Sequence, residues 1–461
     1  KLRWLEPLKD KLPDDWSRNY KEWTEHFGEI SFDNHSARVQ AVWAGEPPIS
    51  EILVKLSSPE IILQYLQDAP HGGGASTEEL ARELSHLVSE RPEAFVSVWE
   101  MLKELDLRYV QAFFSGIHAR TQSHEDSFWP PLLAAMKWAL ERPDANEPEA
   151  SGLSSIIGDI VSSSLPHEEV RIPFALRYDV WSIIEILLEN PNPTVEHEAQ
   201  YGDKNMDPLT FSLNTVRGRA FHTLFKYINW SRRALDVQDR TLESTAEVLP
   251  ALEKHLQPAV DPSLAVRAVY GERLPSLIAF DPDWVTAHLN EFFPSSEELA
   301  GIYKATWDTF IIWTQPYDNV FDLLREQYAL AIEKLGEESL YRSESAASHL
   351  SEHLIAFFAR KQIEYGEGLL HRFYQLASGS QAAHVLWFIA RILREGDVPP
   401  EVLERFKNLI EDRVANGTRE ERVEFGWLFT CEKLEAEWRL GLLRDAVSST
   451  KETDSDHAVL E

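Results

Sequence analysis

Apolar residues recur at the spacing of a helix face along most of the chain. In residues 76–88, the apolar positions Leu80, Leu84 and Leu87 follow Ser76 and Glu79, which have the spacing of a helix capping box. Comparable patterns occur in three further stretches, residues 91–105, 295–313 and 319–332. They predict amphipathic helices of moderate length.

Prolines mark expected helix starts rather than strands. Four residues that can cap a helix each precede a proline, in the pairs Ser58-Pro59, Asp207-Pro208, Asp261-Pro262 and Asp281-Pro282. Such a pair supplies an acceptor for free backbone N–H groups and fixes φ where no donor is needed. Alternating apolar and polar runs bounded by Asn-Gly or Asp-Gly are missing, so no β-hairpin is expected. We therefore predict an all-α protein.

The predicted helices follow one another in pairs joined by short turns, without a strict sequence period. In the absence of TPR and ankyrin signatures, this organisation is typical of an irregular HEAT-like α-solenoid of stacked amphipathic helix pairs. The segment 191–212 is long for a connection inside a domain, which indicates a loop with a function or with mobility. We expect four regions: an N-terminal helical region (1–190), this long polar loop (191–212), a C-terminal helical-repeat region (213–445) and a polar tail (446–461).

The chain is strongly acidic. Its 461 residues include 76 Asp and Glu against 45 Lys and Arg, a formal net charge of -31. That field repels phosphate backbones and anionic membrane surfaces, which argues against nucleic acid as the main partner. No uncharged apolar run approaches the ~20 residues needed to cross a bilayer, and the first residues do not form a signal peptide. With a single cysteine, Cys431, these features predict a cytoplasmic protein without a membrane partner, and we expect the chain to be part of a longer one.

Motifs for nucleotide or nucleophilic chemistry are missing, so we expect neither a cofactor nor an enzymatic activity. Neither G-x-x-x-x-G-K-[ST] nor G-x-S-x-G occurs. The stretch HLSEH, however, has the H-x-x-E-H form of inverted zinc peptidases. His349 and His353 would share a helix face as zinc ligands, with Glu352 as general base and Glu424 as a third ligand. That peptidase architecture requires strands, and so short a match also arises by chance. Zinc-dependent hydrolysis is therefore kept as the alternative function.

A basic helix is expected in residues 214–233, because no acidic residue lies between Asp207 and Asp236. Its apolar arc consists of Leu213, Val216, Ala220, Phe221, Leu224, Tyr227 and Ile228. Arg219, Lys226 and Arg233 form a basic stripe on the opposite side. Internal pairing with acidic neighbours is the usual arrangement for such charges. The alternative is a docking stripe for a protein or an anion, with Trp230 beside it. Nucleic acid is the weakest form of this alternative, although Trp230 and Tyr227 would supply stacking groups.

Arg217 differs from the basic stripe, because it falls inside the apolar arc beside Gly218. A guanidinium there requires a carboxylate, so we predict a buried ion pair. The candidate partners are three acids at nearby element boundaries, Asp207, Asp261 and Asp281. Gly218 would let another backbone approach closely, which offsets its cost of ~1 kcal/mol in a helix.

Five stretches carry a resemblance to a known class of proteins: LNTVRGRAFHTLFKY, DPSLAVRAVYGERLPSLIAFDPDW, TWDTFIIWTQPYDNVFDLLREQY, LSEHLIAFFARKQI and VEFGWLFTCEKLEAEWRLGLL. Together, over residues 213–443, they resemble the C-terminal helical-repeat region of large bacterial multidomain proteins of the STAND NTPase and antiphage-defence type. The resemblance implies a non-enzymatic sensor or scaffold that recognises a protein partner such as a phage component. It also implies contacts with the rest of the same polypeptide, where an effector or NTPase module is expected. A purely structural spacer or oligomerisation scaffold is a further alternative.

Overall fold

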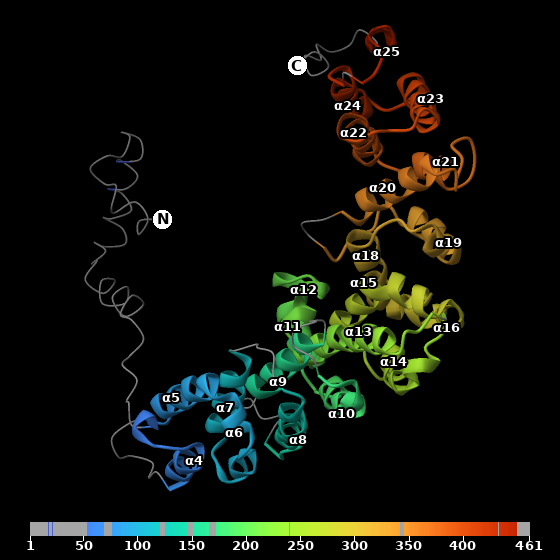
Figure 1. Ribbon diagram of the computed structural model, residues 1–461. Helices are drawn as coiled ribbons and strands as arrows, with labels where there is room; N and C mark the ends of the chain where they lie inside the picture. The colour runs from blue at the N-terminus through green and yellow to red at the C-terminus, as the bar shows by residue number, and fades with distance from the viewer. Residues whose placement is uncertain are drawn as a thin grey trace.

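The fold is all-α, as predicted. The computed structural model describes residues 53–68, 76–119, 125–144, 151–165, 172–238, 240–341, 345–431 and 433–449, and singly residues 17 and 21. Over these residues the regular structure is helical and contains no β-strand. The helices stack in chain order into a solenoid that curves as a crescent, with one row on its inner side and one on its outer side (Figure 1).

The inner row runs along the concave side of the crescent (Figure 1). It consists of α5 (Thr77–Glu90), α7 (Leu107–His118), α9 (Ser151–Ser164), α13 (Val216–Ala234), α15 (Leu264–Phe280), α18 (Ala300–Trp313), α20 (Ala346–Ala359), α22 (Gly379–Glu395) and α24 (Arg419–Phe429). Each of these helices packs against the one before it and the one after it. The concave side is therefore a continuous helical surface.

The outer row consists of shorter and longer helices that return the chain to the inner row. They are α4 (Pro59–Asp68), α6 (Pro92–Val96), α8 (Trp129–Leu140), α10 (Arg177–Leu188), α14 (Leu249–Leu256), α16 (Pro282–Ala287), α17 (Leu289–Phe292), α19 (Asp318–Glu333), α21 (Leu369–Leu376), α23 (Pro400–Asn416) and α25 (Ala436–Ser449). Short 3-10 helices cover Leu53–Lys55, Trp99–Glu104, Asp126–Phe128, Phe174–Leu176, Glu243–Val248 and Glu297–Leu299. The apolar faces of the two rows meet in one extended core.

Several helix starts form where the sequence indicates them. Ser76 and Glu79 make the predicted capping box at the start of α5. Asp207 caps α12 (Pro208–Leu213), and Asp281 caps α16, each from the position before a proline. Asp261 does not follow this pattern, because α15 starts later and is capped by Ser263. Asp261 is therefore available for another contact.

The segment 191–212 is not the long loop that its polar composition predicted. Most of it folds into α11 (Val195–Asn205) and α12, and the side chain of Thr194 caps α11. Both helices lie on the concave side of the crescent, where α12 packs against α13 and α15 (Figure 1). The predicted polar tail also begins too early, because α25 continues to Ser449, and residues 450–461 lie outside the described residues.

The basic helix is α13, and its apolar arc is buried with one exception. Leu213, which the pattern placed on the same helix, is the last residue of α12, and its side chain is 55% exposed. Gly218 makes the close backbone approach that the sequence suggested. A Cβ added there would lie 2.3 Å from the carbonyl oxygen of Ser212, so only glycine lets α12 and α13 meet in this way.

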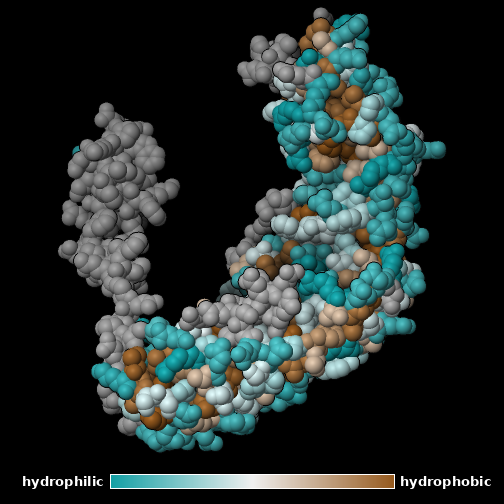
Figure 2. Space-filling model, viewed as in Figure 1, coloured by the Kyte–Doolittle hydropathy of each residue, from teal (hydrophilic) through white to brown (hydrophobic). Residues whose placement is uncertain are grey.

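The surface of the crescent is largely hydrophilic. Figure 2 shows hydrophobic areas near its two ends, over α4 and α5 and around α22 and α24. Within the described residues, every helix is too short or too polar to span a bilayer. The C-terminal end of the crescent therefore exposes an apolar area.

Candidate functional site

Arg217, near the start of α13, is held in the ion pair that the sequence predicted. Its Nε lies 3.1 Å from Oδ2 of Asp261, and the two side chains are 13% and 3% exposed. The guanidinium also donates to the backbone carbonyls of Asn190, at 2.8 Å, and Pro193, at 2.9 Å. Of the three candidate carboxylates, Asp261 is thus the partner.

Asp261 also contacts residues other than Arg217. Its Oδ2 is 2.8 Å from Nδ1 of His255, and its Oδ1 accepts from the backbone N–H of Ser263 at 3.2 Å. Burial alone would raise the pKa of Asp261, but the hydrogen bond with His255 and the charge of Arg217 outweigh it and hold that pKa below its usual value. The network joins α13, α14 and the start of α15 through buried polar contacts.

Two members of the basic stripe, Arg219 and Lys226, face α9. Arg219 forms an ion pair with Asp159. Nζ of Lys226 donates to the hydroxyl of Ser162 at 2.7 Å and to its carbonyl at 3.2 Å. Burial lowers the pKa of Lys226, and the charge of Arg273 lowers it further. These contacts correspond to the internal-pairing interpretation of the stripe.

The other residues assigned to that site, Arg233 and Trp230, lie toward the C-terminal end of α13. The side chain of Arg233 is exposed. Trp230 is half-buried, with its ring edge-on to Phe174 at a centroid distance of 5.3 Å and 5.8 Å from Tyr227. Trp230 therefore takes part in packing. Arg233 faces solvent, as does Lys226, which also contacts Ser162.

His353 of the HLSEH stretch is buried, and both of its ring nitrogens have partners. Nε2 is 3.0 Å from the carbonyl oxygen of Thr314, and Nδ1 is 2.8 Å from the hydroxyl of Tyr328. Because a carbonyl can only accept, these partners assign the proton to Nε2, and Nδ1 then accepts from the tyrosine. Burial lowers the pKa of His353 to about 4, so the ring is neutral at pH 7.

The remaining residues of the zinc alternative point to different neighbours. Oε1 of Glu352 is 3.0 Å from Nε2 of His384 on α22, and its Oε2 is 3.7 Å from Nδ1 of His349. Glu424 lies on α24, where burial raises its pKa and the charge of His384 opposes the rise. In the described part of the chain, no group of three or more His, Cys, Asp or Glu is placed to hold a metal ion. The proposed ligand set of His349, His353 and Glu424 is thus not assembled.

A strip of aromatic and basic side chains lies near the C-terminal end of the crescent, on α22 and α24. We call it the inner-face strip, and it consists of Trp387, Arg391, Arg394, Val423 and Trp427. The guanidinium of Arg391 lies 5.0 Å from the ring centroid of Trp387, and that of Arg394 lies 5.4 Å from Trp427. Val423 and Trp427 are 41% and 47% exposed. Such arginine–aromatic stacking holds large side chains in place while they remain accessible.

The buried side of α22 shows which way the inner-face strip faces. Leu386, Ile389 and Leu393 are buried in the core that α22 shares with the outer row. At ~100° per residue, Arg391 projects from the opposite side of the helix. The inner-face strip therefore belongs to the concave side.

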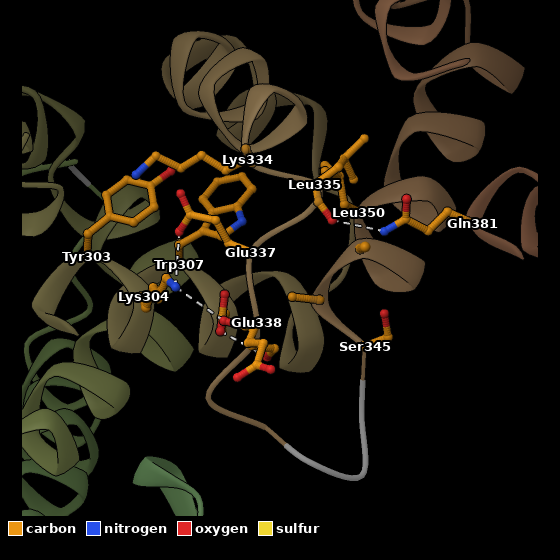
Figure 3. Close-up of a pocket in the computed structure, with 15 residues that line it drawn as sticks. Tyr303, Lys304, Trp307, Lys334, Leu335, Glu337, Glu338, Ser345, Leu350 and Gln381 are labelled. Atoms are coloured by element: carbon orange, nitrogen blue, oxygen red, sulfur yellow. Dashed lines mark hydrogen bonds and ion pairs between the residues drawn. The ribbon is translucent and has the colours of Figure 1, made fainter. Parts of the chain in front are cut away.

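A cavity of about 140 Å³ lies between α18, α19 and α20 (Figure 3). Tyr303 and Trp307 are one turn apart on α18 and line one of its sides. The segment after α19 runs beside these rings and contributes Glu337 and Glu338 to the lining. Asp308, also on the lining, accepts from the backbone N–H of Leu340 at 2.9 Å, which fixes that segment to α18.

Two lysines also line the cavity, in different arrangements. Nζ of Lys304 is 3.0 Å from Oε2 of Glu337 and donates to the carbonyl of Glu338 at 3.3 Å. Nζ of Lys334 lies 4.4 Å from the ring centroid of Tyr303. The hydroxyl of Tyr303 is buried, and among the described residues it has no hydrogen-bond partner. The cavity therefore combines an aromatic wall, paired and unpaired cations, and one unsatisfied hydroxyl.

A second cavity, of about 260 Å³, lies between α11, α12 and the start of α15. Its lining is mainly apolar and includes Val195, Phe211 and Leu264. Glu198 also lines it, but the carboxylate accepts from the backbone N–H groups of Leu264 at 3.1 Å and Ala265 at 2.7 Å. The polar group at this cavity is thus used in capping α15.

Neither the inner-face strip nor the cavity of Figure 3 was predicted from the sequence. A signal for the cavity exists in the spacing of Tyr303 and Trp307, which puts two aromatic rings on one face of an otherwise apolar helix. Such a pair is more often core than ligand site, and the cavity depends on the segment around Glu337, which follows the next helix. The position of this segment could not be predicted from the apolar pattern of α18 alone.

Comparisons of the chain with models of protein families, with curated proteins and with solved structures give no match.

Proposed function

We propose that the chain is a non-enzymatic helical-repeat region that recognises a protein partner along the concave side of its crescent. The observation that carries the proposal is the inner-face strip, in which Trp427 and Arg394 stack on each other at the solvent surface. Tryptophan and arginine are the residue types most enriched among the hot spots of protein interfaces.

The architecture supports the same function. Stacked helix pairs create extended concave surfaces, and repeat proteins use such surfaces to bind other proteins. Here the inner row is continuous from α5 to α24, and α11 and α12 lie over its middle, so a long partner segment has helical surface to contact along the concave side.

Charge indicates the kind of partner surface. The formal net charge of -31 attracts basic proteins at long range and accelerates their encounter. In the inner-face strip, arginines stack on tryptophan rings, so the strip presents both aromatic surface and positive charge. A partner that is basic overall but brings an apolar anchor, rather than its basic residues, to Arg391 and Arg394 fits this surface best.

The resemblance of residues 213–443 to bacterial STAND-type and antiphage-defence proteins suggests the biological setting. In that setting the chain is the sensor or scaffold region of a larger cytoplasmic protein, and the partner is a phage component. An upstream effector or NTPase module would then supply the activity that follows recognition.

Site-specific photo-crosslinking tests the proposal. A photoreactive phenylalanine at Trp427 should crosslink to one defined protein in infected bacteria, and Arg394→Glu should strongly reduce that product. The matched control is the same probe at Leu330 of α19, an exposed apolar residue of the outer row, where no such product is expected. Equal crosslinking from both positions would refute recognition through the inner-face strip.

The spacer alternative has a distinct outcome. If no probe on the concave side crosslinks to another protein, but deletion of the region abolishes assembly of the full-length protein, the chain is a structural spacer or oligomerisation scaffold. Charge reversal of the whole basic stripe is a poor test, because Arg219 and Lys226 have internal partners. Arg233→Glu alone probes that surface without disturbing packing.

A further inference from the structure

The cavity between α18, α19 and α20 contains a buried polar group that the fold leaves without a partner. Tyr303 is 3% exposed, and its hydroxyl makes no hydrogen bond with any described residue. Figure 3 shows the phenol pointing toward the side of the cavity where Trp307, Lys334 and Glu337 lie. A buried hydroxyl without a partner is unfavourable, so a guest that hydrogen-bonds to it gains free energy that no internal group supplies.

The size and walls of the cavity limit what the guest can be. A volume of about 140 Å³ accommodates several water molecules, or the head group and part of the stem of one long side chain. Tyr303 and Trp307 present aromatic surface, and such surface favours a cation over its face.

The charges around the cavity also favour a cation. Lys304 is neutralised by its contact with Glu337, and Glu338 and Asp308 add two further carboxylates to the lining. Burial raises the pKa of the Tyr303 hydroxyl, and the charges of Asp308 and Glu337 raise it further. An anionic guest would therefore enter against the local field, as well as against the net charge of the whole protein.

Lys334 already shows how a cation fits. It follows the last residue of α19, and its Nζ lies 4.4 Å from the ring centroid of Tyr303. Within the described residues, Lys334 has no carboxylate at ion-pair distance, in contrast to Lys304. Its ammonium group thus occupies the aromatic face without being tied to a counter-ion.

We propose that this cavity is a recognition site for a guanidinium or alkylammonium group, and that Lys334 occupies the cation position until a guest replaces it. The guest donates hydrogen bonds to the Tyr303 oxygen and lies near Glu337, while the long stem of Lys334 lets its ammonium move out to solvent. The same chemistry is carried by an arginine or lysine side chain of a protein and by a free polyamine. A protein source rests on the proposed function, but the cation site itself does not.

Ligand-detected NMR titration of the full chain tests the site with agmatine as the probe, and with N-methylurea and acetate as neutral and anionic controls. Agmatine should bind, and the two controls should not. Lys334→Met should tighten agmatine binding by about fivefold, because it removes the internal competitor. Tyr303→Phe, which removes only the hydroxyl, should weaken it by about tenfold. Lys254→Met, at an ion pair with Glu189 far along the chain, should leave it unchanged.

Thermal unfolding of each variant establishes that it is folded before the titration. Weaker agmatine binding in Lys334→Met would overturn the proposed role of Lys334 as an internal competitor. Binding of acetate in preference to agmatine would overturn the proposal in favour of an anion site. No agmatine binding by either the wild type or Lys334→Met would overturn it outright.

A second arm separates the two sources of the cation. An acetylated and amidated Gly-Arg-Gly peptide that binds more tightly than spermidine supports a protein side chain, and the reverse supports a free polyamine. Either result supports the cation site, provided that Tyr303→Phe weakens binding of the tighter ligand. Because crosslinking at Trp427 does not involve this cavity, failure of the cation site and failure of protein recognition are distinguishable.

Discussion

Nε of Arg217 lies 3.1 Å from Oδ2 of Asp261, and this contact ties the first turn of α13 to the residues that precede α15. Neither residue belongs to the inner-face strip. Their pairing therefore belongs to the stability of the crescent, which can be measured separately from binding.

Removing the guanidinium of Arg217 should lower the stability of the fold substantially. We expect Arg217→Met to lower the free energy of unfolding by about 3 kcal/mol, because Asp261 is left buried without its positive partner. Arg233→Met, on the exposed side of the same helix, should change it by less than about 0.5 kcal/mol. Chemical denaturation followed by circular dichroism measures both. Similar losses from the two variants would contradict the buried ion pair as the cause.

The contact between α15 and α18 should be intolerant of a single methyl group. A Cβ at Gly271 would lie 2.2 Å from the backbone oxygen of Thr306, and a backbone atom cannot move aside as a flexible side chain does. We expect Gly271→Ala to destabilise by about 1–3 kcal/mol. At Gly301, whose added Cβ would meet only Cδ2 of Leu264 at 3.7 Å, alanine should be neutral or stabilising by up to about 0.5 kcal/mol. Thermal unfolding curves should therefore shift down for the first variant and not for the second.

His353 should make the stability depend on pH. Its pKa is lowered to about 4 by burial, whereas an unfolded histidine titrates near its ordinary value of about 6.5. Between these values the unfolded chain binds a proton that the folded protein does not, so the free energy of unfolding decreases as the pH falls through this window.

The variant His353→Gln isolates this contribution. Glutamine keeps one donor for Thr314 and one acceptor for Tyr328 but does not titrate. We expect the difference in unfolding free energy between wild type and variant to shrink by about 2 kcal/mol from pH 7 to pH 4.5. Urea denaturation at several pH values measures it. A difference that stays constant with pH would assign the acid sensitivity to other groups.

The basic stripe should respond unevenly to charge reversal. Arg219→Glu places a carboxylate beside Asp159 and should destabilise by about 1 kcal/mol, a modest effect because both groups are partly exposed. Arg233→Glu should leave the stability unchanged within about 0.5 kcal/mol. Parallel denaturation of the two variants gives the comparison. Equal effects would mean that the contact between α13 and α9 contributes nothing.

How much the sequence revealed depended on whether the determining contacts were local. Helix faces repeat every few residues, so the all-α fold and the buried arc of α13 were predictable. The need of Arg217 for a carboxylate was also predictable, because an unpaired guanidinium cannot be buried. The identity of that carboxylate was not predictable, because only the packing of α14 and α15 brings Asp261 to Arg217.

The errors have the same origin. Residues 195–205 are mostly polar because α11 lies on the concave side of the solenoid, and the pattern therefore suggested a loop. Internal pairing of Arg219 and Lys226 was the favoured interpretation, but their partners could not be named because these lie on α9, far back in the sequence. The HLSEH stretch has the spacing of zinc ligands, but Tyr328 and Thr314 from other segments occupy His353.

The inner row has a mechanical consequence. Because each of its helices packs against the one before it and the one after it, a small rotation at one step would tilt every later helix and change the separation of the two ends of the crescent. At the middle of the row, α12 packs against both α13 and α15 on the concave side, and we expect this step to be the stiffest. A change of curvature at the steps after α15 would therefore displace the inner-face strip, which lies on α22 and α24.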